Sequence, residues 1–437
     1  MMRNKTYIII LTSLLSCTTG LFGQIPAPAP AQTVAILLLN GVAHIGNGNV
    51  IQNSVIAFEK GKLTLVADAT TKSVDTSLYK IVIHLNGKHV YPGIITPNST
   101  LGLTEIDQVR ATNDFREVGQ YNPEVRSLIA YNTESRIIPT VRTNGVLIAQ
   151  VTPRGGVISG TSSIVQLDAW NWEDAVLKAD DGIHLNWPSG RLPHIKSRKA
   201  DVKKNEQHEK DVNDLEMFFS DAKAYSELQG PMETNLRFEA MRGLFNERKT
   251  LFIHAQYAKD ILEAIAFVRS FKLSKVVMVG GYDAWRITDV LKDNDIPVIL
   301  RRTHSLPLRV GKDPDLPYKI PYLLHKAGVL FCLDNSGDME AMECRNLPFM
   351  AGTAAAYGLT KEQALMAVTY NTARILGIDH ITGALQEGKD ATLFVSVGDA
   401  LDMCTNDVVY AFIRGRQIDL DNPQKYLYRK YKAHLSH

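Results

Sequence analysis

Two histidines in this chain stand next to residue types that could do chemistry. His254 ends the apolar run 250–255 (TLFIHA), where an imidazole could act as a general acid or base or simply be a hydrogen-bonded wall of a pocket. His304 follows two arginines, and Arg302 beside it could help to bind an acidic ligand, although a structural role is equally open. No Gly-x-Ser-x-Gly motif occurs, so the sequence does not indicate a serine hydrolase.

Alternating strand-like and helix-like segments in the middle of the chain must position these side chains. Apolar runs predict buried strands at 145–151, 250–255, 275–279, 296–300 and 329–333, and helical spacing occurs at 258–271, 283–293 and 362–375. Repeated strand–helix units are typical of a parallel sheet. About 290 residues of such units, from 91 to 382, suit a (β/α)₈ TIM-like barrel better than an open sheet.

Segments rich in β structure flank the barrel region on both sides. Residues 33–90 alternate short apolar runs with Asn-Gly and Lys-Gly turns, and a similar pattern returns at 383–425. The simplest arrangement joins both terminal segments into one small β-sandwich beside the barrel. A Pro-Ala linker at 24–32 precedes them, and the polar tail at 426–437 is expected to be peripheral.

The first 23 residues have the pattern of a secretory signal peptide. A positively charged start precedes the apolar stretch 7–15, and small residues lead to a cleavage site expected near Gly23. We therefore expect secretion across the inner membrane into the periplasm. The alternative is a lipoprotein signal with Cys17 as the lipidated residue, but Leu15 fits that pattern poorly.

Composition and charge narrow the classes of partner. The 437 residues have a net charge of +2, with 45% hydrophobic and 22% charged residues, which is an ordinary globular balance. A groove for phosphates would need a basic field that this composition lacks, so we expect no nucleic-acid partner. Beyond the N-terminal segment no apolar stretch reaches the length of about 18 residues that spans a bilayer, so no transmembrane span is expected.

Five motifs, in matching order and spacing, resemble the amidohydrolase superfamily, in particular its imidazolonepropionase-like branch. They are 60–63 (KGKL), 86–95 (NGKHVYPGII), 358–365 (GLTKEQAL), 369–377 (TYNTARILG) and 383–391 (GALQEGKDA). The resemblance covers nearly the whole chain after the signal peptide. It implies the same barrel with a flanking β domain, and a hydrolase of carbon–nitrogen bonds in cyclic amides or related amides.

The resemblance also implies metal-dependent hydrolysis, in which zinc or another divalent metal at the mouth of the barrel activates a water molecule. The family's ligands are a His-x-His pair on the first strand, a Lys or Glu on the fourth, histidines on the fifth and sixth, and an Asp on the eighth. In this sequence the His-x-His pair falls on Asn98 and Thr100, whose amide and hydroxyl oxygens are weak ligands for zinc. The histidine of the fifth strand is kept, as His254.

The other ligand positions of the family are replaced as well. The histidine of the sixth strand falls on Gly280 or Gly281. The aspartate of the eighth strand falls on Ser336, and Asp334 or Asp338 could substitute for it only if the register shifts. Because catalytic zinc normally takes three protein ligands, we expect no metal and no other cofactor.

Two functions from different classes are compatible with this pattern. The first is a hydrolase of small amides or cyclic amides with a non-standard site, in which His254 and Asp334 are the catalytic residues and the replaced ligand positions line the pocket. The second is a non-catalytic relative that binds a ligand in the periplasm or serves as partner subunit of an intact amidohydrolase. Convergence of His254 with Asn98, Thr100 and a carboxylate would favour the hydrolase.

Overall fold

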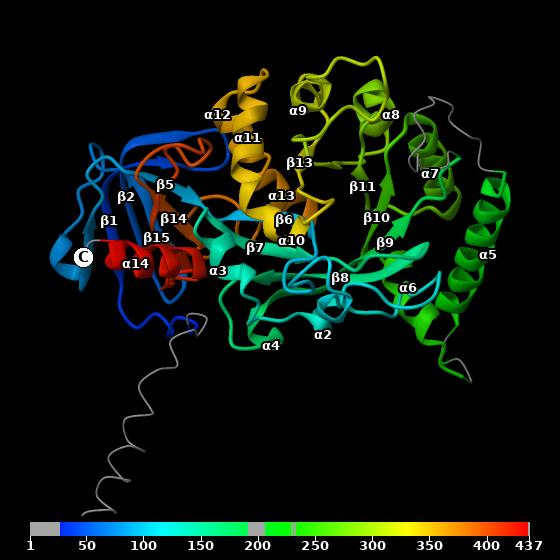
Figure 1. Ribbon diagram of the computed structural model, residues 1–437, viewed down its shortest axis with the longest axis horizontal. Coiled ribbons are helices and arrows are strands. Elements are labelled where there is room, and N and C mark those ends of the chain that lie inside the picture. Colours follow the sequence, from blue (N-terminus) through cyan, green and yellow to red (C-terminus); the bar gives the residue numbers. More distant parts are fainter. Residues whose placement is uncertain (1–26, 191–205, 229, 231–232, 436–437) are drawn as a thin grey trace, which may run out of the picture.

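The computed structural model describes residues 27–190, 206–228, 230 and 233–435. The expected signal peptide and its Cys17 lie outside this part of the chain. Two eight-stranded sheets organise the described residues, a barrel sheet in the middle of the chain and a terminal sheet built from both ends (Figure 1).

The barrel sheet is nearly closed, and its strands follow one another around it in the order β13-β12-β11-β10-β9-β8-β7-β6. The strands are β6 (Ile94–Ser99), β7 (Val146–Val151), β8 (Ile158–Gln166), β9 (Val176–Asn186), β10 (Thr250–Ala255), β11 (Val276–Gly280), β12 (Val298–Leu300) and β13 (Phe331–Leu333). The chain just before α13 bridges the gap between the first and last strands. The N–H of Ile95 donates to the carbonyl of Val368 (2.9 Å), and the N–H of Leu333 donates to that of Ala367 (3.0 Å). The predicted barrel is confirmed.

Helices surround this sheet and contribute buried side chains to the core. They are α2 (Ser127–Ala130), α3 (Ile137–Arg142), α4 (Trp172–Ala175), α5 (His208–Glu227), α6 (Leu236–Phe245), α7 (Ala258–Phe271), α8 (Thr288–Asp293), α9 (Leu316–Lys326), α10 (Glu340–Glu343), α11 (Leu347–Ala356), α12 (Lys361–Met366) and α13 (Tyr370–Leu376). In α7 the buried residues Ile261, Ala264, Ile265 and Val268 follow the spacing i, i+3, i+4, i+7 of a single helix face. That face packs on β10, the strand that carries His254.

One strand of the barrel departs from the parallel sheet that the sequence pattern predicts. β8 runs antiparallel to both of its neighbours. Its Gln166 lies opposite Ile148 of β7, and its Thr161 lies opposite Ile183 of β9. The remaining neighbours in the barrel are parallel. Short turns can connect antiparallel strands, whereas parallel strands need a long crossover, so the chain passes from β7 to β9 without a full crossover helix.

The terminal sheet confirms that the segments before and after the barrel region together form one small β unit. Its strands are β1 (Ile36–His44), β2 (Val50–Glu59), β3 (Lys62–Asp68), β4 (Ile81–His84), β5 (His89–Pro92), β14 (Leu393–Ser396), β15 (Val408–Ile413) and β16 (Arg416–Gln417). Hydrogen bonds connect all eight into one sheet, in which β5 pairs with β14 and so joins the two ends of the chain. The helix α14 (Pro423–Leu435) covers the expected tail and has no buried residue.

The two sheets meet through aromatic packing at the start of the barrel. The ring of Phe394 on β14 stacks on Tyr91 of β5 at 5.3 Å between centroids and lies against Gly145, just before β7. No helix of the described residues is long and apolar enough to cross a membrane.

Candidate active site

A pocket of about 480 Å³ opens where β6, β10 and β13 end. Four of the residues predicted for the site line it: Asn98, Thr100, His254 and Ser336. The rest of its lining consists of Asp107, Gln108, Phe115, Arg154 and the segment 337–340. The mouth of a barrel at the carboxyl ends of its strands is where this fold usually carries its chemistry.

Asp334 lies behind this lining as a fully buried carboxylate. It directly follows β13, and its Oδ2 accepts a hydrogen bond from the Asn98 side-chain amide at 2.8 Å. Ser336 donates both its backbone N–H (3.0 Å) and its hydroxyl (2.9 Å) to the same carboxylate. A buried aspartate thus directly follows the eighth strand, two residues before Ser336, the position to which the family's aspartate was assigned.

The pKa of Asp334 is raised to about 6. Burial raises it by penalising the charged form, and the hydrogen bonds from Asn98 and Ser336 offset part of that effect. A carboxyl with a pKa near 6 has both its acid and its base forms accessible close to neutral pH, which suits a group that takes and returns a proton.

Asn98 is held rigidly in an unusual conformation. Its φ of +48° is left-handed, a region that asparagine tolerates better than most residues. Its N–H donates to Gln150 Oε1 at 3.0 Å, and its carbonyl accepts from Arg154 at 2.7 Å. These two bonds fix the backbone of Asn98 in the left-handed conformation, and the bond to Asp334 fixes its side chain.

A chain of buried polar residues supports the other side of the pocket. His254 Nε2 lies 2.8 Å from His184 Nδ1, and His184 Nε2 lies 3.0 Å from the hydroxyl of Ser162. That hydroxyl donates to Asp181 (2.7 Å), which also accepts from Gln150 (2.8 Å). Through Gln150, which accepts from the N–H of Asn98, the network connects His254 with the Asp334 cluster.

These contacts determine where the protons of the two imidazoles lie. Because the Ser162 hydroxyl donates to Asp181, it accepts from His184 Nε2, which leaves His184 Nδ1 as the acceptor for His254 Nε2. Burial and the nearby charge of Arg154 lower the pKa of His254 to about 3. His254 is therefore a neutral hydrogen-bonding wall of the pocket, and its bonded partner is His184 rather than Asp334.

The other predicted site residues lie beside the pocket and not in its lining. Gly280 ends β11 beneath the amide of Gln256, and a side chain at this position would meet that amide at 2.1 Å. Arg302 donates to the backbone carbonyl of Asp338 (3.3 Å), so it supports the loop of the pocket from outside. His304 is bonded to the Thr353 hydroxyl on α11 at 2.7 Å.

Sequence reasoning missed several residues of the site. Arg154 and Glu340 form an ion pair of 2.9 Å at the pocket wall, yet each is an ordinary loop or helix-start residue in the sequence. His184 stands in a strand, β9, that the apolar pattern did not reveal. Its segment GIHLN follows a charged stretch, and the alternation of polar and apolar residues there was the one available signal.

The donors at the mouth do not fit a catalytic zinc. His254 is the one imidazole among the residues that line the pocket, and both oxygens of Asp334 already accept hydrogen bonds. Within the described parts of the chain, no group of three or more His, Cys, Asp or Glu side chains is placed to hold a metal ion. Three such ligands are what a catalytic zinc normally takes.

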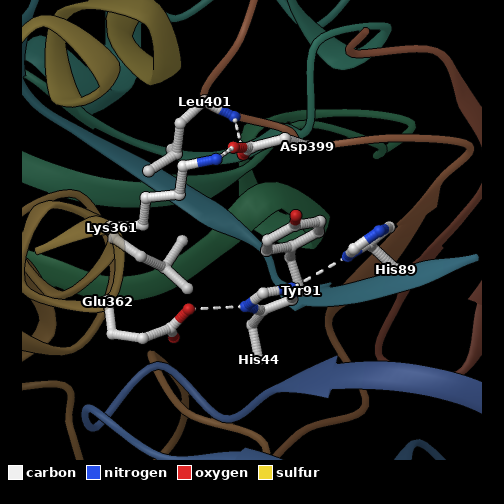
Figure 2. A pocket seen from close by; sticks show the side chains of 8 residues that line it. His44, His89, Tyr91, Lys361, Glu362, Asp399 and Leu401 are labelled. Atoms are coloured by element: carbon white, nitrogen blue, oxygen red, sulfur yellow. Dashed lines mark hydrogen bonds and ion pairs between the residues drawn. The ribbon is translucent and has the colours of Figure 1, made fainter. Parts of the chain in front are cut away.

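A second cavity, of about 100 Å³, lies between the terminal sheet and α12 (Figure 2). His44 on β1 bonds Glu362 of α12 at 2.6 Å and faces His89 of β5 at 3.0 Å. Beside them Lys361 pairs with Asp399 at 2.6 Å. Because the charged groups pair with one another across the boundary, we interpret this cluster as a structural joint between the terminal sheet and the barrel.

Fold and sequence together define the class of this protein. The family model described as "Amidohydrolase family" matches residues 208–418, which include the strands β10 to β13 of the barrel and the strands β14 to β16 of the terminal sheet. Over these residues, just under half of the chain, the sequence matches the amidohydrolase family. The comparison with curated protein sequences gave no match.

Solved structures share this fold at low sequence identity. An amidohydrolase from Thermotoga maritima superposes with a TM-score of 0.75 and 23% identity, covering 88% of this chain and 99% of that one. Molinate hydrolase gives a TM-score of 0.55 and 15% identity, with 90% of this chain and 96% of that chain covered. A Xaa-Pro dipeptidase gives 0.54 and 12%, with 88% and 100% covered. At such identities the likeness concerns the fold.

Proposed function

We propose that this protein hydrolyses a non-peptide carbon–nitrogen bond in a small amide or cyclic amide. The observation that carries the proposal is the Asp334–Ser336 pair, a buried carboxylate with a pKa near 6 bonded to a hydroxyl that lines the pocket. A volume of about 480 Å³ is in the range of small-molecule sites. The resemblance to the imidazolonepropionase-like branch supports a cyclic amide as the substrate.

The proton path of the reaction follows from the hydrogen bonds. A water molecule bonded to Ser336 attacks the amide carbon and passes a proton to the serine oxygen, while the serine proton moves to Asp334. The new C–O bond forms, the C–N bond breaks, and its electron pair goes to nitrogen. The same proton returns from Asp334 through Ser336 to the leaving nitrogen, so the pair ends as it began.

Arg154 supplies positive charge at the same pocket. Its guanidinium lines the cavity and is held by Glu340 and by the carbonyl of Asn98. A fixed cation near the reacting carbonyl stabilises the negative charge that develops on its oxygen in the transition state. Asn98 thus holds both the proposed base, Asp334, and the proposed cation, Arg154.

Replacement of the carboxylate tests this proposal. Asp334→Asn keeps the size of the side chain but cannot accept the proton, and we expect turnover of cyclic amides such as hydantoin, succinimide or 2-pyrrolidinone to fall by about 100-fold or more. Ring opening is followed by mass spectrometry. Asp289→Asn, an exposed carboxylate on α8, is the matched control and should keep wild-type turnover. Equal turnover in both variants would remove Asp334 from the mechanism.

One observation favours a second function, a non-catalytic ligand-binding or partner subunit. Every oxygen of Asp334 is already occupied by Asn98 and Ser336, and His254 is committed to His184. Such a protein would bind cyclic amides, seen as a raised melting temperature, without opening the ring of any of them. Co-purification with an intact amidohydrolase would then identify the partner role. For either function we propose the periplasm as the location, on the signal-peptide pattern of residues 1–23.

A further inference from the structure

Asn98 lines the pocket and has one hydrogen-bond acceptor without a partner among the described residues. Its N–H, its carbonyl and its side-chain N–H₂ are all engaged, by Gln150, Arg154 and Asp334 respectively. The fourth group, the side-chain oxygen Oδ1, is buried and has no hydrogen-bond partner among the described residues. Asn98 is only 2% exposed and lines the pocket, so an unpartnered acceptor there calls for a ligand that donates an N–H or O–H.

The orientation of this amide follows from its neighbour. A carboxylate can only accept hydrogen bonds, so Asp334 takes the N–H₂ side of the amide and leaves its oxygen without a bond. When Asp334 is ionised its charge polarises the amide and makes Oδ1 a stronger acceptor. Such an acceptor prefers a donor that carries positive charge.

The charges around the pocket have the sign that matches. The carboxylates of Asp107, Asp338 and Glu340 line it together with the single guanidinium of Arg154. Arg154 and Glu340 neutralise each other at 2.9 Å. The carboxylates of Asp107 and Asp338 have no ion-pair partner within the described chain, so the lining holds more acidic than basic side chains.

We propose that this pocket selects amides that carry a protonated amino group. An N–H of the ligand donates to Asn98 Oδ1, and the ammonium charge lies in the field of Asp107 and Asp338. This inference rests on the proposed function only for the amide part of the ligand. The selection for a cation depends on the lining alone, so it holds whether the ligand is hydrolysed or only bound.

A pair of matched lactams separates charge from shape. ε-Caprolactam and α-amino-ε-caprolactam share the ring and the amide, and only the second is a cation near neutral pH. Titration calorimetry with the purified protein should show the amino lactam binding about 10-fold or more tightly than the neutral one. Added salt should reduce that preference, because screening acts on the charge and leaves the ring contacts unchanged.

Variants at the rim locate the selecting charges. The double variant Asp107→Asn/Asp338→Asn should lower the affinity for the amino lactam to within about 2-fold of that for ε-caprolactam, while ε-caprolactam itself binds as before. Asp289→Asn, on the outer helix α8, is the control and should keep the full preference. Both rim residues are solvent-accessible, so these variants are expected to fold.

Asn98→Ala tests the acceptor itself and should weaken both lactams by about 10-fold or more, with a thermal melt to check folding. If this variant does not fold, the rim variants decide the question. Equal affinity of the wild type for both lactams, tighter binding of the neutral one, or binding of neither would overturn the proposed selection. Binding of the amino lactam without ring opening would leave the selection standing and count against the hydrolase alone.

Discussion

At the scale of single residues, the site depends on groups whose properties come from their neighbours. Asp334 is one carboxylate among many in the sequence, yet burial raises its pKa to about 6 while Asn98 and Ser336 hold it in place. His254, the histidine that the sequence singles out, has a pKa lowered to about 3 and is hydrogen-bonded to His184. In the proposed reaction the proton is therefore transferred by the aspartate.

The raised pKa makes the proposed activity dependent on pH. The base form of Asp334 is present above its pKa, so kcat/KM should fall as the pH drops through about 6 and level off above it.

The variant Ser336→Ala tests the hydroxyl. It removes the group that relays the proton and one hydrogen bond that favours the charged carboxylate. The remaining kcat/KM should therefore be lower, and the midpoint of its pH–rate profile should lie at higher pH. A midpoint that stays unchanged would show that Ser336 does not touch the titrating group.

At the scale of elements, the junction between β5, β14 and β7 positions the barrel against the terminal sheet. Gly145 has φ +86°, and a side chain there would come within 2.5 Å of the Phe394 ring. The ring is fully buried and stacks on Tyr91, so it has little room to move. A glycine is needed at this position for both its backbone conformation and the close approach of the ring.

A pair of glycine variants separates these two requirements. Gly145→Ala should lower the free energy of unfolding by about 3 kcal/mol, because it adds a steric clash to the cost of positive φ. Gly87→Ala has a similar φ of +81° with open space around it, and should lose only about 1 kcal/mol. Urea denaturation of both variants measures the difference. Equal losses would mean that the ring of Phe394 yields easily.

At the scale of the whole molecule, a buried ion cluster fastens three distant parts of the chain. Asp168, after β8, bonds Arg142 of α3 at 2.6 Å and Arg416 of β16 at 3.1 Å. The same carboxylate accepts the N–H of Ala29 at 3.0 Å, so the start of the described chain is held to the barrel and to the last strand. One side chain thus connects the segment around Ala29 and the strand β16 to the barrel.

Removal of this carboxylate should destabilise the whole fold. Asp168→Ala leaves the buried guanidinium of Arg142 without its partner, and we expect the free energy of unfolding to drop by about 3–5 kcal/mol. Asp289→Ala removes an exposed pair with Lys292 and should cost no more than about 1 kcal/mol. Thermal and urea unfolding measure both. A loss in Asp168→Ala as small as in the control would show that the two arginines find other partners.

The sequence by itself determined the class of fold and the general place of the site. Apolar runs at strand spacing, helices with one apolar face and the five family motifs are local features, and local features predicted the barrel, the small terminal β unit and the convergence of Asn98, Thr100 and His254 on one pocket. The antiparallel β8 escaped prediction because the direction of a strand depends on its connections rather than on its composition.

Only the tertiary structure decided what each polar residue can do. Asp334 and Asn98 are 236 positions apart, and His184 and His254 are 70 apart, so no local pattern reveals that these side chains touch. Contact and burial change the pKa of a group, choose the tautomer of an imidazole and leave one amide oxygen without a partner. Those properties arise when distant segments exclude water together, which is why they appear in the folded molecule alone.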